Sequence, residues 1–347
     1  MLRIGVVGYG TGGKHFHAPF IQAARGCTLA GVVARAEKTI AAAKADLPDQ
    51  PIYPSLTAMI ASGQVDAVAI TTPPETRREL VLEAIAAGLH VVADKPFAPD
   101  AARARDFDRA AKAKGVVLGV YQNRRFDSDI QTLRQVLIDR RLGRLWRIHS
   151  RMDFDDPATL EAGPTGGLLR DLGSHLVDQM LWLLGPAISV DAQMDHVNLP
   201  GGRTDASFTI TLRHESGVHS HISATKLNRL NCRELRAYGE AGSYVTQSTD
   251  IQAQQLFSGK RPAADPTTWG YEPETHWGTL RTVTGAEIIR AAQGRYHDYY
   301  DLFAAAVRNG TPPPVTAEVG ARTLAVLDAA RQSDLENRSI TLDVPHG

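Results

Sequence analysis

The feature that most constrains the fold is an alternation of short apolar runs with helix-like stretches over the first 122 residues. The apolar runs are nearly continuous, which is typical of parallel strands buried on both faces. We predict strands at Leu2–Val7, Leu29–Ala34, Val65–Thr71, His90–Ala93 and Val116–Tyr121. We predict helices between them at Pro19–Arg25, Glu37–Ala45, Leu56–Ala61, Thr76–Ala87 and Ala101–Ala113. Right-handed crossovers then give a doubly wound parallel sheet.

The pattern changes near Gly143, where strands begin to follow one another with short turns. This arrangement indicates an antiparallel sheet, and therefore a second domain of the α+β class. The predicted strands are Leu145–Asp153, Ile188–Val197, Ser207–Arg213, Val218–Thr225, Glu234–Tyr238 and Ser243–Gln247. Helices are expected at Ser174–Leu184, Tyr296–Arg308 and Glu318–Asp334, and a loop at Phe257–Gly285. We place the two domains at residues 1–122 and 123–347.

Composition narrows the classes of partner. The 38 basic side chains balance 38 acidic ones, so there is no overall attraction to nucleic acid or to an anionic membrane. No apolar run approaches about 18 residues, so no membrane span is predicted. The first residues lack the pattern of a signal peptide, and Cys27 and Cys232 lack metal-type spacing, so we expect a cytoplasmic protein with reduced thiols. The histidine pairs His15/His17 and His219/His221 have no further ligand at suitable spacing, so no metal site is predicted.

A glycine-rich segment directly follows the first predicted strand. Gly8-Tyr9-Gly10-Thr11-Gly12-Gly13 satisfies G-x-G-x-x-G and opens a strand–helix–strand unit. Glycines in this context make a tight turn and let backbone N–H groups approach a pyrophosphate at a helix N-terminus. The alternative is a glycine-rich turn with a structural role only. Because Pro19 interrupts the expected first helix, Lys14–His17 is predicted to form a turn before a helix that starts near Ala18.

The end of the second strand bears on the choice of dinucleotide. NAD-binding domains usually carry an acid there to accept from the ribose 2′-hydroxyl. Here the chain reads Val32-Val33-Ala34-Arg35-Ala36, and Arg35 with Lys38 is suited to a 2′-phosphate. The sequence therefore favours NADP over NAD, although Arg35 followed by Glu37 is also compatible with an ordinary surface arginine.

Two further groups of residues carry candidate chemistry. Lys95, in Asp94-Lys95-Pro96, follows the predicted fourth parallel strand, where ligands of open α/β sheets gather, and its ammonium would stabilise a developing alkoxide. Asp171 and His175 are four residues apart, so one helical turn would place them on the same face as an oriented general base. The alternatives are a surface lysine, and a capping aspartate with a packed histidine.

Taken together, these motifs resemble the Gfo/Idh/MocA oxidoreductases over nearly the whole chain, and especially a subgroup that contains NADP-dependent scyllo-inositol dehydrogenases. The resemblance rests on the glycine motif, Asp94-Lys95-Pro96-Phe97 and the segment from Gly166 to Gln179. It is reinforced by His17-Ala18-Pro19, Asn123-Arg124-Arg125-Phe126-Asp127-Ser128-Asp129 and Gly239-Glu240-Ala241-Gly242-Ser243-Tyr244.

The resemblance implies a Rossmann domain followed by a substrate domain built on a large, mostly antiparallel open sheet, through which subunits commonly pair as homodimers or homotetramers. It places Lys95, Asp171 and His175 on the family's catalytic residues. The implied cofactor-binding residues are Gly8, Gly10, Thr11, Gly12, Gly13, Arg35, Thr72, Pro73, Asp94, Lys95 and Asn123. The implied substrate-binding residues are Lys95, Asn123, Arg124, Asp171 and His175.

We therefore expect an NADP-dependent dehydrogenase that acts on a secondary hydroxyl of a cyclitol or sugar. Arg77 stands where the family often has histidine, and Arg170 where the subgroup often has an aromatic residue, so the substrate is less determined than the reaction. The alternatives are a dehydrogenase of another sugar, such as an aldose, deoxysugar or anhydrosugar, and a non-catalytic NADP-binding redox sensor.

Overall fold

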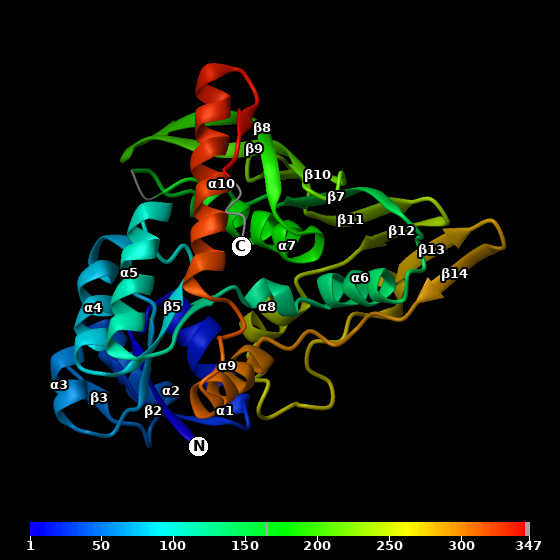
Figure 1. The fold of residues 1–347 in the computed structure, drawn as a ribbon. Helices are drawn as coiled ribbons and strands as arrows, with labels where there is room; N and C mark the ends of the chain where they lie inside the picture. Colours follow the sequence, from blue (N-terminus) through cyan, green and yellow to red (C-terminus); the bar gives the residue numbers. More distant parts are fainter. Residues whose placement is uncertain (164–165, 344–347) are drawn as a thin grey trace. The chain divides into compact units, whose positions relative to one another are not determined.

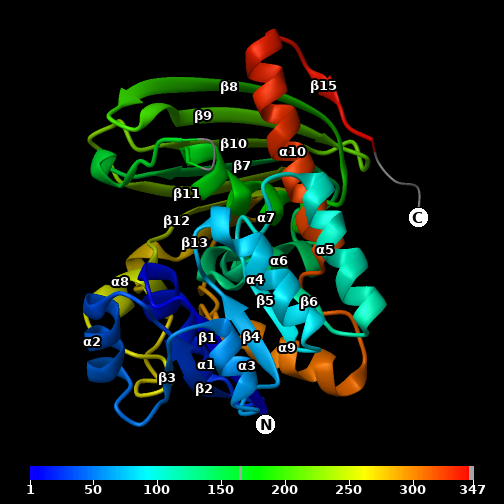
Figure 2. The same cartoon turned by 90° about the vertical axis from the view of Figure 1, so that its left-hand side faces the viewer.

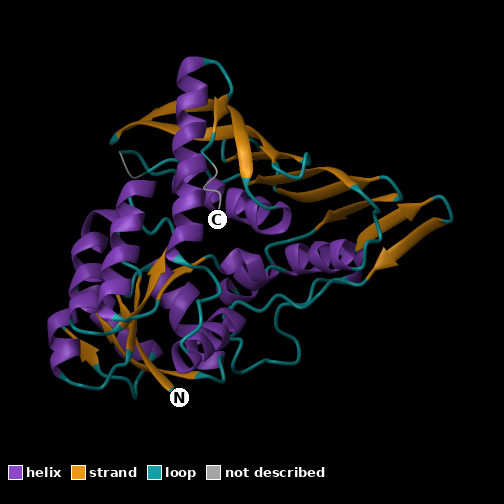
Figure 3. Ribbon diagram, in the orientation of Figure 1, coloured by secondary structure: helices purple, strands orange, loops and turns teal. Residues whose placement is uncertain are grey.

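The computed structural model describes residues 1–163 and 166–343, which form two compact units, each built on one sheet (Figures 1 and 3). The first unit comprises Met1–Asn123, Gln255–Trp269 and Arg295–Arg322. The second comprises Arg124–Gln254, Gly270–Gly294 and the chain from Thr323 onward. The units are thus discontinuous in sequence, whereas the predicted domains, 1–122 and 123–347, are continuous.

A parallel sheet of six strands forms the centre of the first unit, in the order β3-β2-β1-β4-β5-β6. The strands are β1 (Leu2–Val7), β2 (Cys27–Val33), β3 (Ile52–Tyr53), β4 (Ala67–Ile70), β5 (His90–Asp94) and β6 (Leu118–Tyr121). All neighbouring strands are parallel, which confirms the predicted Rossmann sheet. Sequence analysis missed β3, because its two residues are too few to show a pattern. The strand that ends at Asp94 is consequently the fifth along the chain and not the fourth.

Helices cover both faces of this sheet, as near-continuous apolar strands require (Figure 2). They are α1 (Ala18–Ala23), α2 (Glu37–Asp46), α3 (Leu56–Ala61), α4 (Pro74–Ala86), α5 (Ala101–Lys114) and α9 (His297–Asn309). α4 and α5 lie on one face, and α1 and α9 lie on the other. Before α1, Gly12–His17 forms a π-helix where a turn was predicted, and α1 starts at Ala18 as expected.

The second unit is built on a sheet of nine strands, in the order β14-β13-β12-β11-β7-β10-β9-β8-β15. Only the pairing of β7 with β10 is parallel, so the predicted mostly antiparallel sheet is confirmed. The strands are β7 (Leu145–Asp153), β8 (Ala187–Leu199), β9 (Gly202–His214), β10 (His219–Thr225), β11 (Cys232–Gly239), β12 (Gly242–Gln247), β13 (Gly278–Thr282), β14 (Gly285–Ile289) and β15 (Ile340–Thr341). The helices of this unit are α6 (Ser128–Ile138) and α7 (Ser174–Leu184), and α8 (Ile251–Phe257) and α10 (Ala317–Glu336) contribute to both units.

The prediction of a loop at Phe257–Gly285 is wrong in part, because this segment contains β13. Gly278 allows this strand to lie against Tyr244 of β12, since a Cβ at Gly278 would stand 2.1 Å from the Tyr244 hydroxyl. These edge strands are stabilised by pairing, β13 with β12 and β14 with β13, and not by a local pattern. Their sequence alone therefore gave no signal.

Burial alternates along the central strands of this sheet. In β7, Ile148, Ser150 and Met152 are buried, whereas Arg147, His149 and Arg151 are exposed or half-buried on the other face. That outer face is polar and carries many charges. The association of subunits through it remains a prediction. Among the helices of the part of the chain that the structure describes, none has the length and apolar composition needed to cross a bilayer.

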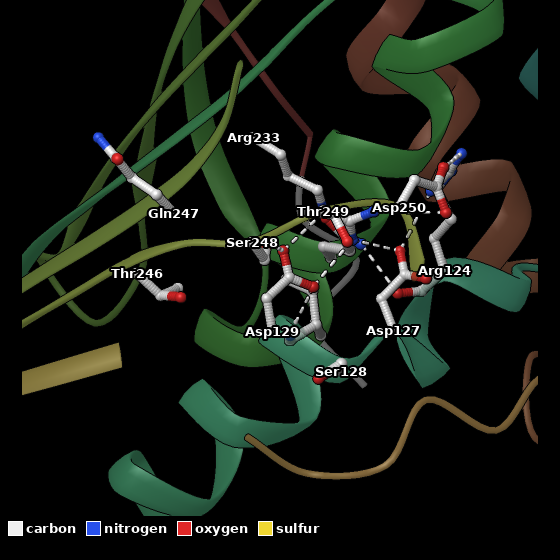
Figure 4. Close-up of polar contacts among 12 residues, drawn as sticks. Arg124, Asp127, Ser128, Asp129, Arg233, Thr246, Gln247, Ser248, Thr249 and Asp250 are labelled. Carbon is white, nitrogen blue, oxygen red and sulfur yellow. Dashed lines mark hydrogen bonds and ion pairs between the residues drawn. The ribbon is translucent and has the colours of Figure 1, made fainter. Parts of the chain in front are cut away.

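A buried cluster of charges holds the second unit together (Figure 4). We call Arg124, Asp127, Asp129, Arg233 and Asp250 the Arg233 cluster. Arg233 on β11 donates to Asp129 over 2.7 and 2.8 Å and to Asp127 over 2.5 Å. Arg124 donates to Asp250 over 2.6 Å and to Asp127 over 3.3 Å. The cluster thus links β11 to the start of α6 and to the residue before α8.

The Arg233 cluster contains two cations and three carboxylates, so its charges do not balance. Burial raises the pKa of Asp127, an effect that Arg233 and Arg124 oppose and that the neighbouring Asp250 and Asp129 strengthen. Burial also acts on Asp250, but Arg124 and Arg233 outweigh it and lower the pKa of this carboxyl. The two arginines therefore determine whether the buried carboxylates remain charged.

We expect Arg233→Met to destabilise the protein by about 3–5 kcal/mol, because it leaves buried carboxylates without their main cation. In this variant the folded-state pKa of Asp127 rises further above its unfolded value, because burial raises it and Arg233 no longer opposes that effect. Stability is then regained as the pH falls from 8 toward about 5, because the folded state takes up protons. Urea unfolding at both pH values measures the effect. Arg236→Met on the same strand, which removes an exposed pair with Glu234, is the control and should cost at most about 1 kcal/mol. An equal loss for both variants would contradict this account.

Candidate functional site

The glycine-rich turn after β1 has the geometry of a dinucleotide cradle. Gly8 has φ +102°, which L side chains rarely adopt, and makes the tight turn. A Cβ at Gly13 would stand 2.0 Å from the Gly8 carbonyl oxygen, so this glycine permits the close packing of helix on strand. A Cβ at Gly10 would meet no atom within 4 Å, so the backbone there is open to a ligand. These are the three roles that glycines play at a pyrophosphate.

The end of β4 lies against this turn. The Thr71 hydroxyl donates to the Gly8 carbonyl oxygen over 2.7 Å and so closes the turn. The adjacent Thr72 hydroxyl oxygen is buried and has no hydrogen-bond partner among the described residues. A buried hydroxyl beside a turn with open backbone suits a polar ligand that completes its hydrogen bond. The residues present therefore fit a dinucleotide.

Arg35 follows β2, the strand next to β1 in the sheet. Its side chain is exposed, as is that of Lys38 in the first turn of α2. Neither residue forms an ion pair within the described part of the chain. Both are thus available to a phosphate, but their role in binding one remains a prediction.

Lys95 directly follows β5 and is half-buried. Its backbone N–H donates to Asp94 Oδ1 over 2.8 Å. The other Asp94 oxygen lies beside the glycine-rich turn, since a Cβ at Gly12 would stand 3.2 Å from it. The structure therefore brings the Asp94-Lys95 pair to the predicted cofactor turn, within one compact unit.

Behind Asp94 lies a buried polar chain that sequence analysis did not identify as functional. His17 Nε2 is 3.5 Å from Asp94 Oδ1, and His17 Nδ1 is 2.6 Å from the Tyr300 hydroxyl. Burial raises the pKa of Asp94, but His17, Arg77 and Lys95 outweigh this effect and hold that pKa below its usual range. Asp94 is therefore charged near neutral pH. Tyr300 lies more than 280 residues beyond His17, so no local pattern connects them.

Asp171 and His175 occupy the second unit, at the start of α7. Asp171 lies in a π-helical turn, Leu169–Gly173, and His175 lies in the first turn of α7, so one regular α-helical turn does not hold both. His175 is 5% exposed, whereas the Asp171 side chain is 46% exposed and accepts from Lys226 Nζ over 3.1 Å. Sequence analysis missed Lys226, which follows β10 and shares no motif with Asp171.

Close packing explains both glycines before this turn. A Cβ on Gly166 would stand 2.4 Å from the Glu161 carbonyl oxygen. Gly167 has φ +97°, and a Cβ on it would stand 2.2 Å from Asp205 Oδ1. Asp205 in turn accepts from the Leu169 N–H over 2.6 Å. The turn that carries Asp171 is therefore fixed on β9.

Two further predicted site residues, Asn123 and Arg124, lie between β6 and α6, in the 3-10 helix Asn123–Phe126. Asn123 is 6% exposed. Arg124 is directed to Asp250 and Asp127 within the Arg233 cluster. A second buried pair joins Arg125 to Asp178 of α7 over 2.6 and 2.7 Å. Much of this segment thus stabilises the second unit, and contacts of Asn123 or Arg124 with substrate remain a prediction.

Lys95 belongs to the first unit, and Asp171 and His175 belong to the second. Their joint action on one substrate remains a prediction. No group of three or more His, Cys, Asp or Glu side chains suited to a metal ion occurs in residues 1–163 and 166–343. Of the predicted histidine pairs, His219 and His221 lie on one face of β10, where the ring of His221 is 4.7 Å from that of His149.

The three glycine roles can be separated by substitution. Gly13→Ala forces a Cβ against the Gly8 carbonyl oxygen, so we expect a loss of about 1–3 kcal/mol in stability together with weaker dinucleotide binding. Gly10→Ala meets no protein atom, so its melting temperature should equal that of the wild type while its Kd for NADP rises about tenfold or more. Thermal unfolding and fluorescence titration measure the two effects. Wild-type binding by Gly10→Ala would show that the cradle lies elsewhere.

Comparison with known proteins agrees with this geometry. Residues 2–122 match the Gfo/Idh/MocA oxidoreductase family with an NAD-binding Rossmann fold, and residues 130–245 match a Gfo/Idh/MocA C-terminal domain. The chain is 29% identical to scyllo-inositol 2-dehydrogenase (NADP(+)) IolW of Bacillus subtilis, over 99% of this chain and 96% of that protein. It is 31% identical to the uncharacterized oxidoreductase YdgJ of Escherichia coli, over 98% and 99% of the two chains.

Solved structures give the same result. The structure of yvaA from Bacillus subtilis superposes with a TM-score of 0.88 at 29% identity, over 99% of this chain and 100% of that one. Both predicted domain types are therefore found, in the predicted order. The chain belongs to the Gfo/Idh/MocA family of oxidoreductases, as its motifs indicated.

Proposed function

We propose that this protein is an NADP-dependent dehydrogenase that transfers a hydride between nicotinamide and a secondary hydroxyl of a cyclitol or sugar, with scyllo-inositol as the first candidate. The observation that carries the proposal is the position of Lys95 in the turn that contacts the glycine cradle through Asp94. The similarity to IolW over nearly the full length supports the cyclitol.

In the oxidative direction, His175 takes the proton of the reacting hydroxyl as general base. Lys95 donates a hydrogen bond to the same oxygen and stabilises its developing negative charge. Asp171 binds a neighbouring hydroxyl and orients His175, and Lys226 balances its charge. The bound nicotinamide would supply the acceptor for the hydride. The contribution of the protein is to hold the reacting carbon in place and to manage the proton.

The preference for NADP follows from the charges at the end of β2. Arg35 and Lys38 are both exposed there, and no acidic side chain occupies the tip of the strand. A 2′-phosphate would accept from the guanidinium in a paired, charge-assisted arrangement. NAD lacks this phosphate and would gain nothing from these cations.

A spectrophotometric screen tests the reaction. It follows absorbance at about 340 nm and crosses NADP and NAD with scyllo-inositol, myo-inositol and common aldoses. We expect turnover with NADP and a cyclitol, and a loss of about 10²–10³-fold in kcat for Lys95→Ala with NADP affinity retained. The matched control is Lys114→Ala, which removes an exposed lysine of the same unit.

Each outcome of the screen has a distinct meaning. Turnover of an aldose or another sugar alone would replace the cyclitol with another substrate of the same class. NADP binding without turnover on any polyol would favour a redox sensor. Unchanged turnover by Lys95→Ala would refute the role of this lysine.

Cofactor choice is tested by Arg35→Asp. Removing a charge-assisted hydrogen bond to phosphate costs about 1.5–3 kcal/mol, so the ratio of kcat/KM for NADP over NAD should fall about 10–100-fold. Lys44→Asp makes the same charge change on the exposed side of α2 and should leave the ratio near that of the wild type. If both variants behave alike, only the net charge matters and Arg35 does not contact the phosphate.

A further inference from the structure

Arg77 is a buried cation that the proposed chemistry does not use. It lies in the first turn of α4 and is 4% exposed. Its Nε and Nη2 donate to the Thr72 carbonyl oxygen over 3.2 and 2.6 Å. Its Nη1 donates to the carbonyl oxygens of Asp94 and Pro96 over 2.8 and 2.5 Å. One guanidinium thus joins the loop after β4 to the loop after β5.

A buried cation in the first turn of a helix is energetically unfavourable unless its hydrogen bonds offset the cost. The N-terminal turn of a helix disfavours positive charge, because its N–H groups point outward. Burial of a guanidinium also costs free energy unless hydrogen bonds satisfy it. Here each of the three guanidinium nitrogens, Nε, Nη1 and Nη2, donates to a backbone carbonyl oxygen. The Arg77 side chain is therefore bound to these backbone carbonyls and is not exposed to solvent.

The acceptors lie on either side of Lys95. Arg77 Nη1 donates to the carbonyl oxygens of Asp94 and Pro96, the residues on either side of Lys95. A shift of the Lys95 backbone would therefore distort or break these hydrogen bonds. The Lys95 N–H is held in addition by Asp94 Oδ1. A side chain leaves its backbone in a direction that the backbone determines. These bonds therefore restrict where the Lys95 ammonium can reach.

The other side of the same guanidinium acts on the predicted cofactor-binding segment. Thr72 follows Thr71, whose hydroxyl closes the glycine turn at Gly8. Arg77 thus fixes Thr72 and Lys95 relative to each other, within one compact unit. Lysine could not replace it in this role, because a single ammonium lacks the planar fork that spans separate acceptors.

We propose that Arg77 is a positioning residue, which sets the Lys95 ammonium against the dinucleotide cradle by clamping the loops after β4 and β5. This inference rests on the proposed function, in which Lys95 acts on the substrate oxygen. It also gives a physical role to a position where the family often has histidine. The sequence difference is then a difference in how the Lys95 loop is supported.

Kinetics of Arg77→Lys and Arg77→Gln test the proposal. Displacement of a reacting group by about 1 Å can cost about 10²-fold, so kcat should fall about 10–100-fold, by a larger factor than the rise in the Kd for NADP that follows from releasing Thr72. Arg78→Gln is the matched control, because it removes an exposed arginine one residue further along α4. Added guanidinium should restore part of the activity of Arg77→Ala, by filling the same hydrogen bonds, but should not restore Lys95→Ala.

A second measurement does not depend on the substrate. Trace acetylation with acetic anhydride, followed by peptide mapping, gives the reactivity of Lys95 relative to the exposed Lys114. We expect the relative reactivity of Lys95 to change several-fold in Arg77→Lys and not in Arg78→Gln. This readout remains usable if Arg77→Gln fails to fold, and a merely structural role for Arg77 would not alter it in a folded variant.

The outcomes separate the two proposals. If Arg77→Lys folds and retains both wild-type kcat and wild-type Lys95 reactivity, the positioning role is overturned. If Lys95→Ala keeps full activity, the proposed function fails, whatever the acetylation of Lys95 shows. If Lys95 reactivity changes in Arg77→Lys and kcat falls by a larger factor than NADP affinity, the positioning role is supported.

Discussion

The approach of the first helical turn to the end of β1 is the constraint on which the first unit depends. The backbone of Gly13 lies so close to the Gly8 carbonyl that no side chain fits between them. The glycine turn lies at the carboxyl edge of the sheet, where the neighbouring parallel strands β4 and β5 also end. Thr71 donates to Gly8 in this turn, and Asp94, which precedes Lys95, lies beside Gly12. A wider separation would leave a sheet of the same order without a cradle.

Buried charge holds the site residues in both units. In the first, Asp94 lies between His17 and the Lys95 backbone, and Arg77 spans the neighbouring carbonyls. In the second, Arg233 gathers carboxylates from α6 and the segment before α8. Such groups are costly to bury unless every partner is present, so they favour one arrangement of the loops over many similar ones. Rigid loops suit a reaction that depends on the placement of a carbon, an oxygen and a proton.

Local patterns predicted most of the regular structure. Leu2–Val7, Leu56–Ala61, Leu145–Asp153 and Ser174–Leu184 occur with the predicted bounds, because each has a strong period or clear end signals. Most of the failures have a common cause. β3, β13, β14 and β15 are short strands that exist by pairing with a neighbour, and the π-helical turns at Gly12–His17 and Leu169–Gly173 lie where glycines pack closely. The short helix α8 was not predicted either. None of these features leaves a periodic trace in the sequence.

The sequence by itself determined the fold class, the family and the candidate chemistry of Lys95, Asp171 and His175, because spacing along the chain carries that information. Only the tertiary structure showed which residues support them. Arg77 reaches Asp94 and Pro96, Tyr300 reaches His17, and Lys226 reaches Asp171. These partners are far apart in sequence or are joined through backbone carbonyls, which have no side-chain signature. Such hydrogen bonds form only because folding brings distant segments of the chain together, and no local motif specifies them.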